Sequence, residues 1–160
     1  MERLWSPWRM EYIESARDDE TDEGCPFCAL ADGDERILAR TEHAFVTLAK
    51  YPYNPGHLLI LPARHTGDLE DVTPPEHAAI AILLQRSIRA LRSTSDPGGF
   101  NVGLNLGRTA GAGIPDHLHW HVVPRWGGDT NFMPVVGQTR VLPQLLEDTF
   151  AKLKPAFDRA

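Results

Sequence analysis

The sequence predicts an α+β domain built on a largely antiparallel sheet. Three observations support this fold class: short β-rich runs come in pairs, one long amphipathic helix separates the pairs, and a second helical stripe lies near the end of the chain. A parallel α/β sheet would require a helix between successive strands, and the sequence does not alternate in that way.

The first pair of strands is expected at Ala44–Leu48 and His57–Leu61. Both runs are apolar and rich in residues that favour strands. The spacer between them contains Tyr51–Gly56, which is dense in proline, asparagine and glycine, the residues that form turns. We therefore expect two strands joined by a loop.

The long helix is expected to begin after Thr73 and to end at Asp96–Gly99. Thr73 is a suitable N-cap, Pro74 suits the first turn, and Glu76 completes a capping box with Thr73. Apolar residues then recur on one helical face, namely Ile80, Leu83, Leu84, Ile88 and Leu91.

The second pair of strands is expected at Phe100–Leu106 and Leu118–Val123, with the small-residue loop Thr109–Pro115 between them. A last helix is indicated by an apolar stripe of Leu142, Leu145, Leu146, Phe150 and Leu153. We expect Pro155 to end it, because proline interrupts helical hydrogen bonding.

The chain is expected to form a single domain at residues 25–160, preceded by an arm at residues 1–24. The whole chain has 160 residues with 16 Lys+Arg against 22 Asp+Glu, a net charge of −6. This acidic balance argues against a nucleic-acid polymer as partner, although a small phosphate compound needs only a few local donors. The longest apolar run is too short to span a membrane, and the N-terminus does not resemble a signal peptide. A cytoplasmic protein that does not bind membranes is expected.

Three histidines, His117, His119 and His121, are spaced by two in the last predicted strand. Side chains at i, i+2 and i+4 of a strand share one face, so the imidazoles would stand in a row about 6–7 Å apart. Three interpretations remain open: chance histidines on a solvent face, a three-histidine metal centre, and an imidazole nucleophile flanked by proton donors. A nearly linear row suits tetrahedral zinc poorly.

The cysteines Cys25 and Cys28 form a C-x2-C pair. Such a pair is half a zinc site, a redox pair or two buried thiols, and the surroundings lack the βαβ pattern of a thioredoxin-like protein. Zinc would need two more ligands. The histidines available are His43, His57, His65, His77 and the row at 117, 119 and 121.

The segment from His117 to Val123 resembles the signature of the histidine triad (HIT) family, in which three histidines alternate with apolar residues. The surrounding residues match too, in Asn54-Pro-Gly-His57, Asn105-Leu-Gly107 and Pro124-Arg-Trp126. Within the family, the chain resembles the diadenosine tetraphosphate phosphorylases of actinobacteria. The resemblance implies a homodimer and an antiparallel sheet of about five strands, with one long helix and a C-terminal helix.

The resemblance also implies an enzyme for nucleotidyl transfer or hydrolysis at the α-phosphate of a dinucleoside polyphosphate. His119 would form a nucleotidyl-histidine intermediate, and His121 would contact the phosphate. A nucleoside phosphoramidase, or a nucleotide-binding module with little turnover, is the alternative.

Further residues are expected to bind the nucleotide. The backbone N–H groups of Gly111, Ala112 and Gly113 are expected to hold phosphate oxygens, and Asn105 to lie near the ribose or phosphate. The apolar runs Phe45–Leu48 and Leu58–Ile60 would border the base.

By resemblance to the galactose-1-phosphate uridylyltransferase branch of the family, a structural Zn²⁺ would be held by Cys25, Cys28, His65 and His117. His57 is then interpreted as a structural residue hydrogen-bonded within the first strand pair.

Overall fold

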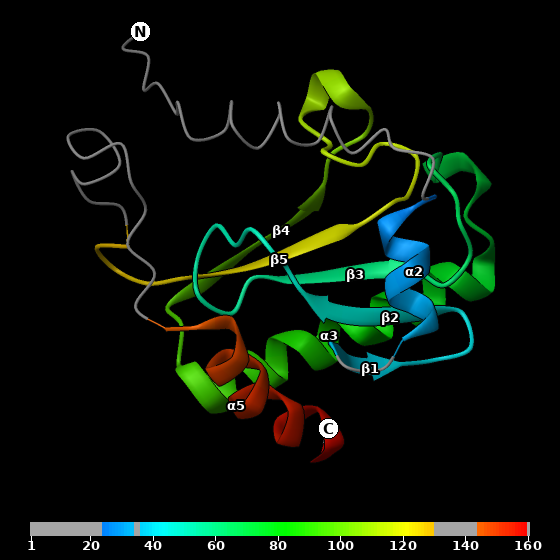
Figure 1. Ribbon diagram of the computed structural model, residues 1–160. Helices are drawn as coiled ribbons and strands as arrows, with labels where there is room; N and C mark the ends of the chain where they lie inside the picture. The colour runs from blue at the N-terminus through cyan, green and yellow to red at the C-terminus, as the bar shows by residue number, and fades with distance from the viewer. Residues whose placement is uncertain (1–23, 34–35, 130–143, 160) are drawn as a thin grey trace, which may run out of the picture.

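The computed structural model describes residues 24–33, 36–129 and 144–159 (Figure 1). Apart from Gly24, the arm expected at residues 1–24 lies outside these described residues. The described chain is an α+β fold in which a five-stranded sheet is combined with helices.

The sheet has the strand order β1-β2-β3-β5-β4, and every neighbouring pair is antiparallel. The strands are β1 (Ile37–Arg40), β2 (Ala44–Leu48), β3 (Leu58–Pro62), β4 (Gly99–Leu104) and β5 (Trp120–Arg125). The prediction for β2 is confirmed, and β3, β4 and β5 are displaced by one or two residues from the predicted bounds. The short β1 has no sequence pattern of its own and is defined by its pairing with β2.

The long helix α3 (Pro74–Ser95) begins and ends where the sequence predicts. Thr73 and Glu76 form the capping box, and Asp96 ends the helix in the left-handed conformation with φ 44°. The predicted apolar face packs into the main core, with Ile80, Leu83 and Leu91 buried.

The C-terminal helix α5 (Leu146–Arg159) continues through Pro155, so the prediction that this proline ends it is wrong. An interior proline costs about 3 kcal/mol, but the turn around it buries Leu153 and Phe157, each worth about 1.5–3 kcal/mol. Packing therefore outweighs the local penalty. Of the predicted stripe, Leu145 precedes the helix and is exposed, and Leu142 lies outside the described residues.

The two faces of the sheet have different roles. One face is covered by α3 and α5, which bury Val46, Leu58, Ile60 and other residues in the main core. The short helix α2 (Pro26–Asp32) lies over the opposite face, where Phe45 and Leu61 form a smaller apolar cluster (Figure 1). His121 projects on this second face, because it pairs with Leu59 of the same cluster.

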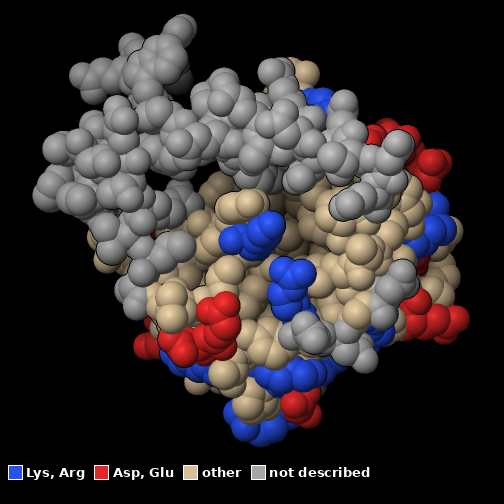
Figure 2. Space-filling view, in the orientation of Figure 1, with Lys and Arg blue, Asp and Glu red and all other residues tan. Residues whose placement is uncertain are grey.

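In the described part of the chain, no helix combines the length and apolar character needed to cross a membrane. On the face drawn in Figure 2, the basic side chains of the described residues stand apart and alternate with acidic and neutral ones.

Candidate active site and metal centre

The histidine row lies at the start of β5, where the chain enters the middle of the sheet. His121 is within the strand, whereas His117 and His119 precede it in the segment that leads to Trp120. The rings of His119 and His121 are neighbours, with centroids 5.1 Å apart and planes inclined at 72°. The His117 ring is directed to a different set of partners, the two cysteines.

His119 is held in one tautomer by the backbone. Its Nδ1 lies 2.9 Å from the carbonyl oxygen of His117. Because a carbonyl oxygen only accepts hydrogen bonds, Nδ1 carries the proton and Nε2 keeps its lone pair. His119 is buried, with 6% of its surface exposed, and this desolvation lowers its pKa. A neutral imidazole with an available Nε2 is the form that a nucleophile requires.

His121 is oriented by a chain of hydrogen bonds that begins in the loop before β3. The backbone N–H of Tyr53 donates to Nδ1 of His57 (3.1 Å), and Nε2 of His57 lies 2.9 Å from Nδ1 of His121. With Nδ1 of His57 accepting, its Nε2 carries the proton and donates to His121. The second nitrogen of His121, Nε2, is then the protonated one and is a donor to an anion.

His57 was interpreted from the sequence as hydrogen-bonded within the first strand pair, and its carbonyl does accept from the N–H of Ala49 at 3.0 Å, beyond the end of β2. Its side chain also reaches outside the pair, because it bonds to Tyr53 in the loop and to His121 on β5. Tyr53 also stacks on the His57 ring, with centroids 4.9 Å apart and planes at 14°. The sequence signal for His57 was its place at the end of the Asn54–His57 motif, but only the β3–β5 pairing shows which residue it contacts.

Phe27 is a second site residue that sequence reasoning missed. It lies on α2 between the two cysteines, and its ring contacts His119 with centroids 5.2 Å apart and His117 with centroids 5.6 Å apart. The short helix α2 therefore brings an aromatic side chain against the nucleophile candidate.

A four-residue cluster of soft and imidazole ligands lies beside the histidine row. Its ligand atoms all lie within 4.8 Å of one another. The members are Cys25, Cys28, His65 and His117, the set that the family resemblance implies. His43 and His77 are not members, and His77 is exposed on α3.

Three distances between ligand atoms of this cluster fit a tetrahedral zinc ion. Nδ1 of His117 lies 3.4 Å from Sγ of Cys25 and 3.6 Å from Sγ of Cys28, and Nδ1 of His65 lies 3.4 Å from Sγ of Cys28. Ligands at about 2.0–2.3 Å from a tetrahedral ion are about 3.3–3.8 Å from one another. Neither Cys25 nor Cys28 forms a disulfide bond in the described part of the chain.

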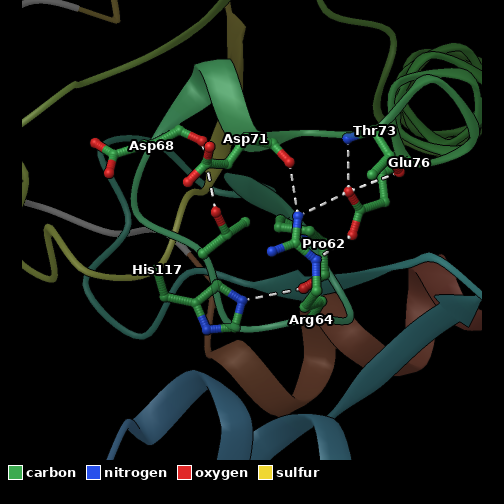
Figure 3. A network of polar contacts seen from close by, with 8 residues as sticks. Pro62, Arg64, Asp68, Asp71, Thr73, Glu76 and His117 are labelled. Atoms are coloured by element: carbon green, nitrogen blue, oxygen red, sulfur yellow. Dashed lines mark hydrogen bonds and ion pairs between the residues drawn. The ribbon is translucent and has the colours of Figure 1, made fainter.

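A hydrogen bond from the second ring nitrogen of His117 orients its Nδ1 toward the cysteines. Its Nε2 lies 3.0 Å from the carbonyl oxygen of Pro62, so Nε2 is the donor and Nδ1 presents its lone pair to the cysteines (Figure 3). Desolvation lowers the pKa of His117, which keeps the ring neutral as metal binding requires.

The glycine-rich loop uses more of its backbone N–H groups in internal hydrogen bonds than the sequence suggests. The N–H of Gly111 donates to the carbonyl of Arg108 (2.9 Å) and that of Ala112 to the carbonyl of Gly107 (3.2 Å). These two N–H groups, which were expected to bind phosphate, are therefore used inside the loop. Of the three expected phosphate donors, the N–H of Gly113 remains. Asn105, at the end of β4, contacts the Gly111 carbonyl through Nδ2 at 3.5 Å.

The sheet, the alternating histidines and the cysteine–histidine cluster define a class of small α+β proteins in which a row of histidines lies beside a possible metal-binding cluster. The HIT domain family model matches residues 31–128, more than half of the chain. The protein therefore belongs to the histidine triad family.

One curated relative is an AP-4-A phosphorylase from Mycobacterium tuberculosis, which is 45% identical over 93% of this chain and 80% of its own length. With this relative in the same family, the protein is an enzyme. A Zn-bound histidine triad family protein from Mycobacterium smegmatis has a TM-score of 0.70 and 33% identity, over 85% of this chain and 94% of that one. A uridylyltransferase structure shares the fold, with a TM-score of 0.73 and 18% identity over 98% of this chain and 52% of that one.

Proposed function

We propose that the protein transfers a nucleotidyl group from a dinucleoside polyphosphate, diadenosine tetraphosphate in the first place, to phosphate or water. The observation that carries this proposal is the hydrogen bond between Nδ1 of His119 and the His117 carbonyl, which directs the lone pair of a neutral ring outward from Nε2. The relative named an AP-4-A phosphorylase supports this choice of substrate.

In the first step, Nε2 of His119 attacks the α-phosphorus. A P–N bond forms, the P–O bond to the leaving polyphosphate breaks, and its electron pair departs with the oxygen. Nε2–H of His121 donates to a non-bridging oxygen and stabilises the charge that develops there. His57 holds His121 in the required tautomer through the 2.9 Å hydrogen bond.

In the second step, the acceptor attacks the same phosphorus and the electron pair of the P–N bond returns to Nε2 of His119. Phosphate as acceptor converts an adenylyl group to ADP. Water converts it to AMP and releases one proton to the solvent. In both cases the other product is ATP, which leaves in the first step.

The nucleotide is proposed to bind beside α2, on the side where its residues adjoin the histidines. Phe27 and Leu30 of α2 and Leu59 of β3 form the apolar surface beside the histidines, and they supply an environment for a base. Of the expected base-lining strands, only alternate residues face this side, because Val46, Leu58 and Ile60 belong to the opposite core. We propose the N–H of Gly113 and the side chain of Asn105 as further contacts to phosphate or ribose.

We propose that Cys25, Cys28, His65 and His117 hold one Zn²⁺. Four protein ligands fill a tetrahedral site, so the ion would stabilise the fold and supply no Lewis acidity to the reaction. Thiolate ligands persist in a reducing compartment, which agrees with a cytoplasmic location.

We propose a homodimer formed through β4. This strand is at the edge of the described sheet, and Val102 on it is 47% exposed. An edge strand offers unpaired backbone groups to a second copy. Sedimentation velocity should show a dimer, and Val102→Lys should shift it toward monomer. A wild-type monomer at micromolar concentration would contradict this assembly.

The test of the reaction is product analysis of the full-length protein incubated with diadenosine tetraphosphate, with and without inorganic phosphate. ADP plus ATP formed only with phosphate identifies phosphorolysis, and AMP plus ATP identifies hydrolysis. Cleavage of a nucleoside phosphoramidate alone would favour a phosphoramidase. Nucleotide binding without turnover of either compound would contradict an enzyme of this kind.

The matched variants are His119→Ala and His77→Ala. The first should abolish turnover while nucleotide binding persists, because it removes the nucleophile. The second removes an exposed histidine of α3 and should leave turnover unchanged. Retained turnover in His119→Ala would refute the assigned role.

A further inference from the structure

The loop that follows β3 carries His65, and the residue before it is fixed to the start of α3. Arg64 forms a paired contact with Glu76, from Nε to Oε1 at 3.0 Å and from Nη2 to Oε2 at 3.1 Å. Nη2 also donates to the carbonyl oxygen of Asp71 at 2.8 Å (Figure 3). The guanidinium of Arg64 therefore links the loop after β3 to Asp71 and to Glu76 at the start of α3.

The carboxylate of Glu76, which binds this guanidinium, is buried and held by further hydrogen bonds. It is 5% exposed, and its Oε2 accepts from the backbone N–H of Thr73 at 2.8 Å and from the Thr73 hydroxyl at 2.9 Å. The hydrogen bond from Arg64 lowers the pKa of Glu76 to about 2, so the carboxylate stays ionised at neutral pH. The capping box thus serves both the helix and the loop.

The residues after His65 are fixed independently. The carbonyl of Thr66 accepts from the N–H of Leu118 at 2.7 Å. Gly67 lies so close to the turn before β5 that a Cβ there would stand 2.9 Å from the carbonyl oxygen of Pro115. His65 itself is exposed, and its ring is directed to Cys28 and His117. Its position therefore depends on the backbone on either side of it.

We propose that the Arg64–Glu76 pair positions His65 for metal binding. The pair holds His65 where its Nδ1 completes the tetrahedron of ligand atoms. This inference rests on the proposed zinc site. A ligand fixed in place before the ion arrives loses less conformational freedom on binding, and supporting contacts of this kind typically change metal affinity about 10–100-fold. The simpler alternative is that the pair only stabilises the beginning of α3.

The experiment compares Arg64→Met with Lys154→Met in the full-length, zinc-loaded protein. Lys154 is a matched control on α5, because it also pairs with one carboxylate, Asp158 at 3.2 Å, and one carbonyl, Leu38 at 3.0 Å. The two basic side chains are 48% and 42% exposed. Zinc affinity is measured by titration with a chromogenic chelator, and thermal unfolding is followed in parallel.

We expect Arg64→Met to weaken zinc binding about tenfold and Lys154→Met to leave it within twofold. Arg64→Lys should recover part of the loss, because it keeps the charge but not the forked geometry. Cobalt-substituted Arg64→Met should show an altered ligand-field spectrum, since His65 no longer holds its place. If Arg64→Met is poorly folded, Glu76→Gln provides the same comparison with a smaller change of shape.

The decisive measurement is a double-mutant cycle with His65→Ala. If Arg64 acts through His65, Arg64→Met should cause no further loss of zinc affinity once His65 is removed. An equal loss in both backgrounds, or unchanged zinc affinity with only a lower melting temperature, would overturn the inference. Failure of the wild-type protein to bind zinc would instead refute the proposed metal site.

Discussion

The ring of Phe27 lies against the ring of His119, with centroids 5.2 Å apart and planes inclined at 54°. Since Cys25 and Cys28 flank Phe27, the segment that supplies two residues of the candidate metal cluster also covers the proposed nucleophile. The candidate metal cluster and the histidine row are therefore neighbours through α2 as well as through the chain from His117 to His119.

Phe27→Ala should lower kcat for dinucleotide cleavage about tenfold. Loss of the ring admits water beside His119 and frees its side chain, so fewer molecules hold Nε2 in the reactive orientation. Phe27→Leu is the control, because it restores most of the apolar bulk and should recover activity. Steady-state kinetics on both variants checks this, and a wild-type kcat in Phe27→Ala would contradict it.

The pH dependence of kcat/KM should reflect the lowered pKa of His119. Desolvation lowers this pKa below the ordinary value of 6.5, and the neutral form present above the pKa is the nucleophile. Activity should therefore persist as the pH falls to 6.5 and decline only at lower pH. In Phe27→Ala, where water reaches the ring, the acid limb should move upward toward 6.5. An acid limb above pH 6.5 in the wild type would contradict the desolvated site.

His57→Phe should reduce kcat about 10–100-fold while the fold is retained. The ring volume is roughly kept, but the N–H of His57 that lies 2.9 Å from Nδ1 of His121 is lost. His121 is then no longer held in one tautomer. The double variant with His121→Asn should be little worse than His121→Asn alone, because both residues act through one group. Independent, additive losses would show that His57 acts elsewhere.

Removal of the metal should expose both thiols and destabilise the protein. We expect one zinc ion per chain by atomic absorption in protein purified without chelator, and reaction of Cys25 and Cys28 with a thiol reagent only after chelation. Cys28→Ser should abolish stoichiometric zinc and lower the melting temperature by several degrees. Zinc-free wild-type protein with the same melting temperature would exclude a structural metal.

Stability should depend on the ionisation of Glu76 in acid. The folded-state pKa of about 2 is lower than the ordinary value of 4.5, so the stabilisation is complete above pH 4.5 and is lost as the pH falls toward 2. Denaturant unfolding of wild type and Glu76→Gln should therefore differ most near neutral pH. The two curves should converge near pH 2, and a constant difference down to that pH would indicate that the charge is not involved.

Local chemistry was readable from the sequence where it depends on neighbours in the chain. The capping box of Thr73 and Glu76, the strand Ala44–Leu48 and the C-x2-C pair are examples, since propensity and spacing act over a few residues. Pro155 shows the limit of this approach. Its local penalty predicts a helix end, but burial of Phe157 against the main core outweighs it.

The sequence by itself determined the α+β class, the alternating histidines and, through family resemblance, the four residues of the candidate metal cluster. The tertiary structure alone decided that His57 contacts His121, that Phe27 covers His119, and that Arg64 pairs with Glu76. The physical reason is distance along the chain. The first two contacts join segments far apart in the chain, which strand pairing and packing across the second face of the sheet bring together. The third joins the loop after β3 to the start of α3.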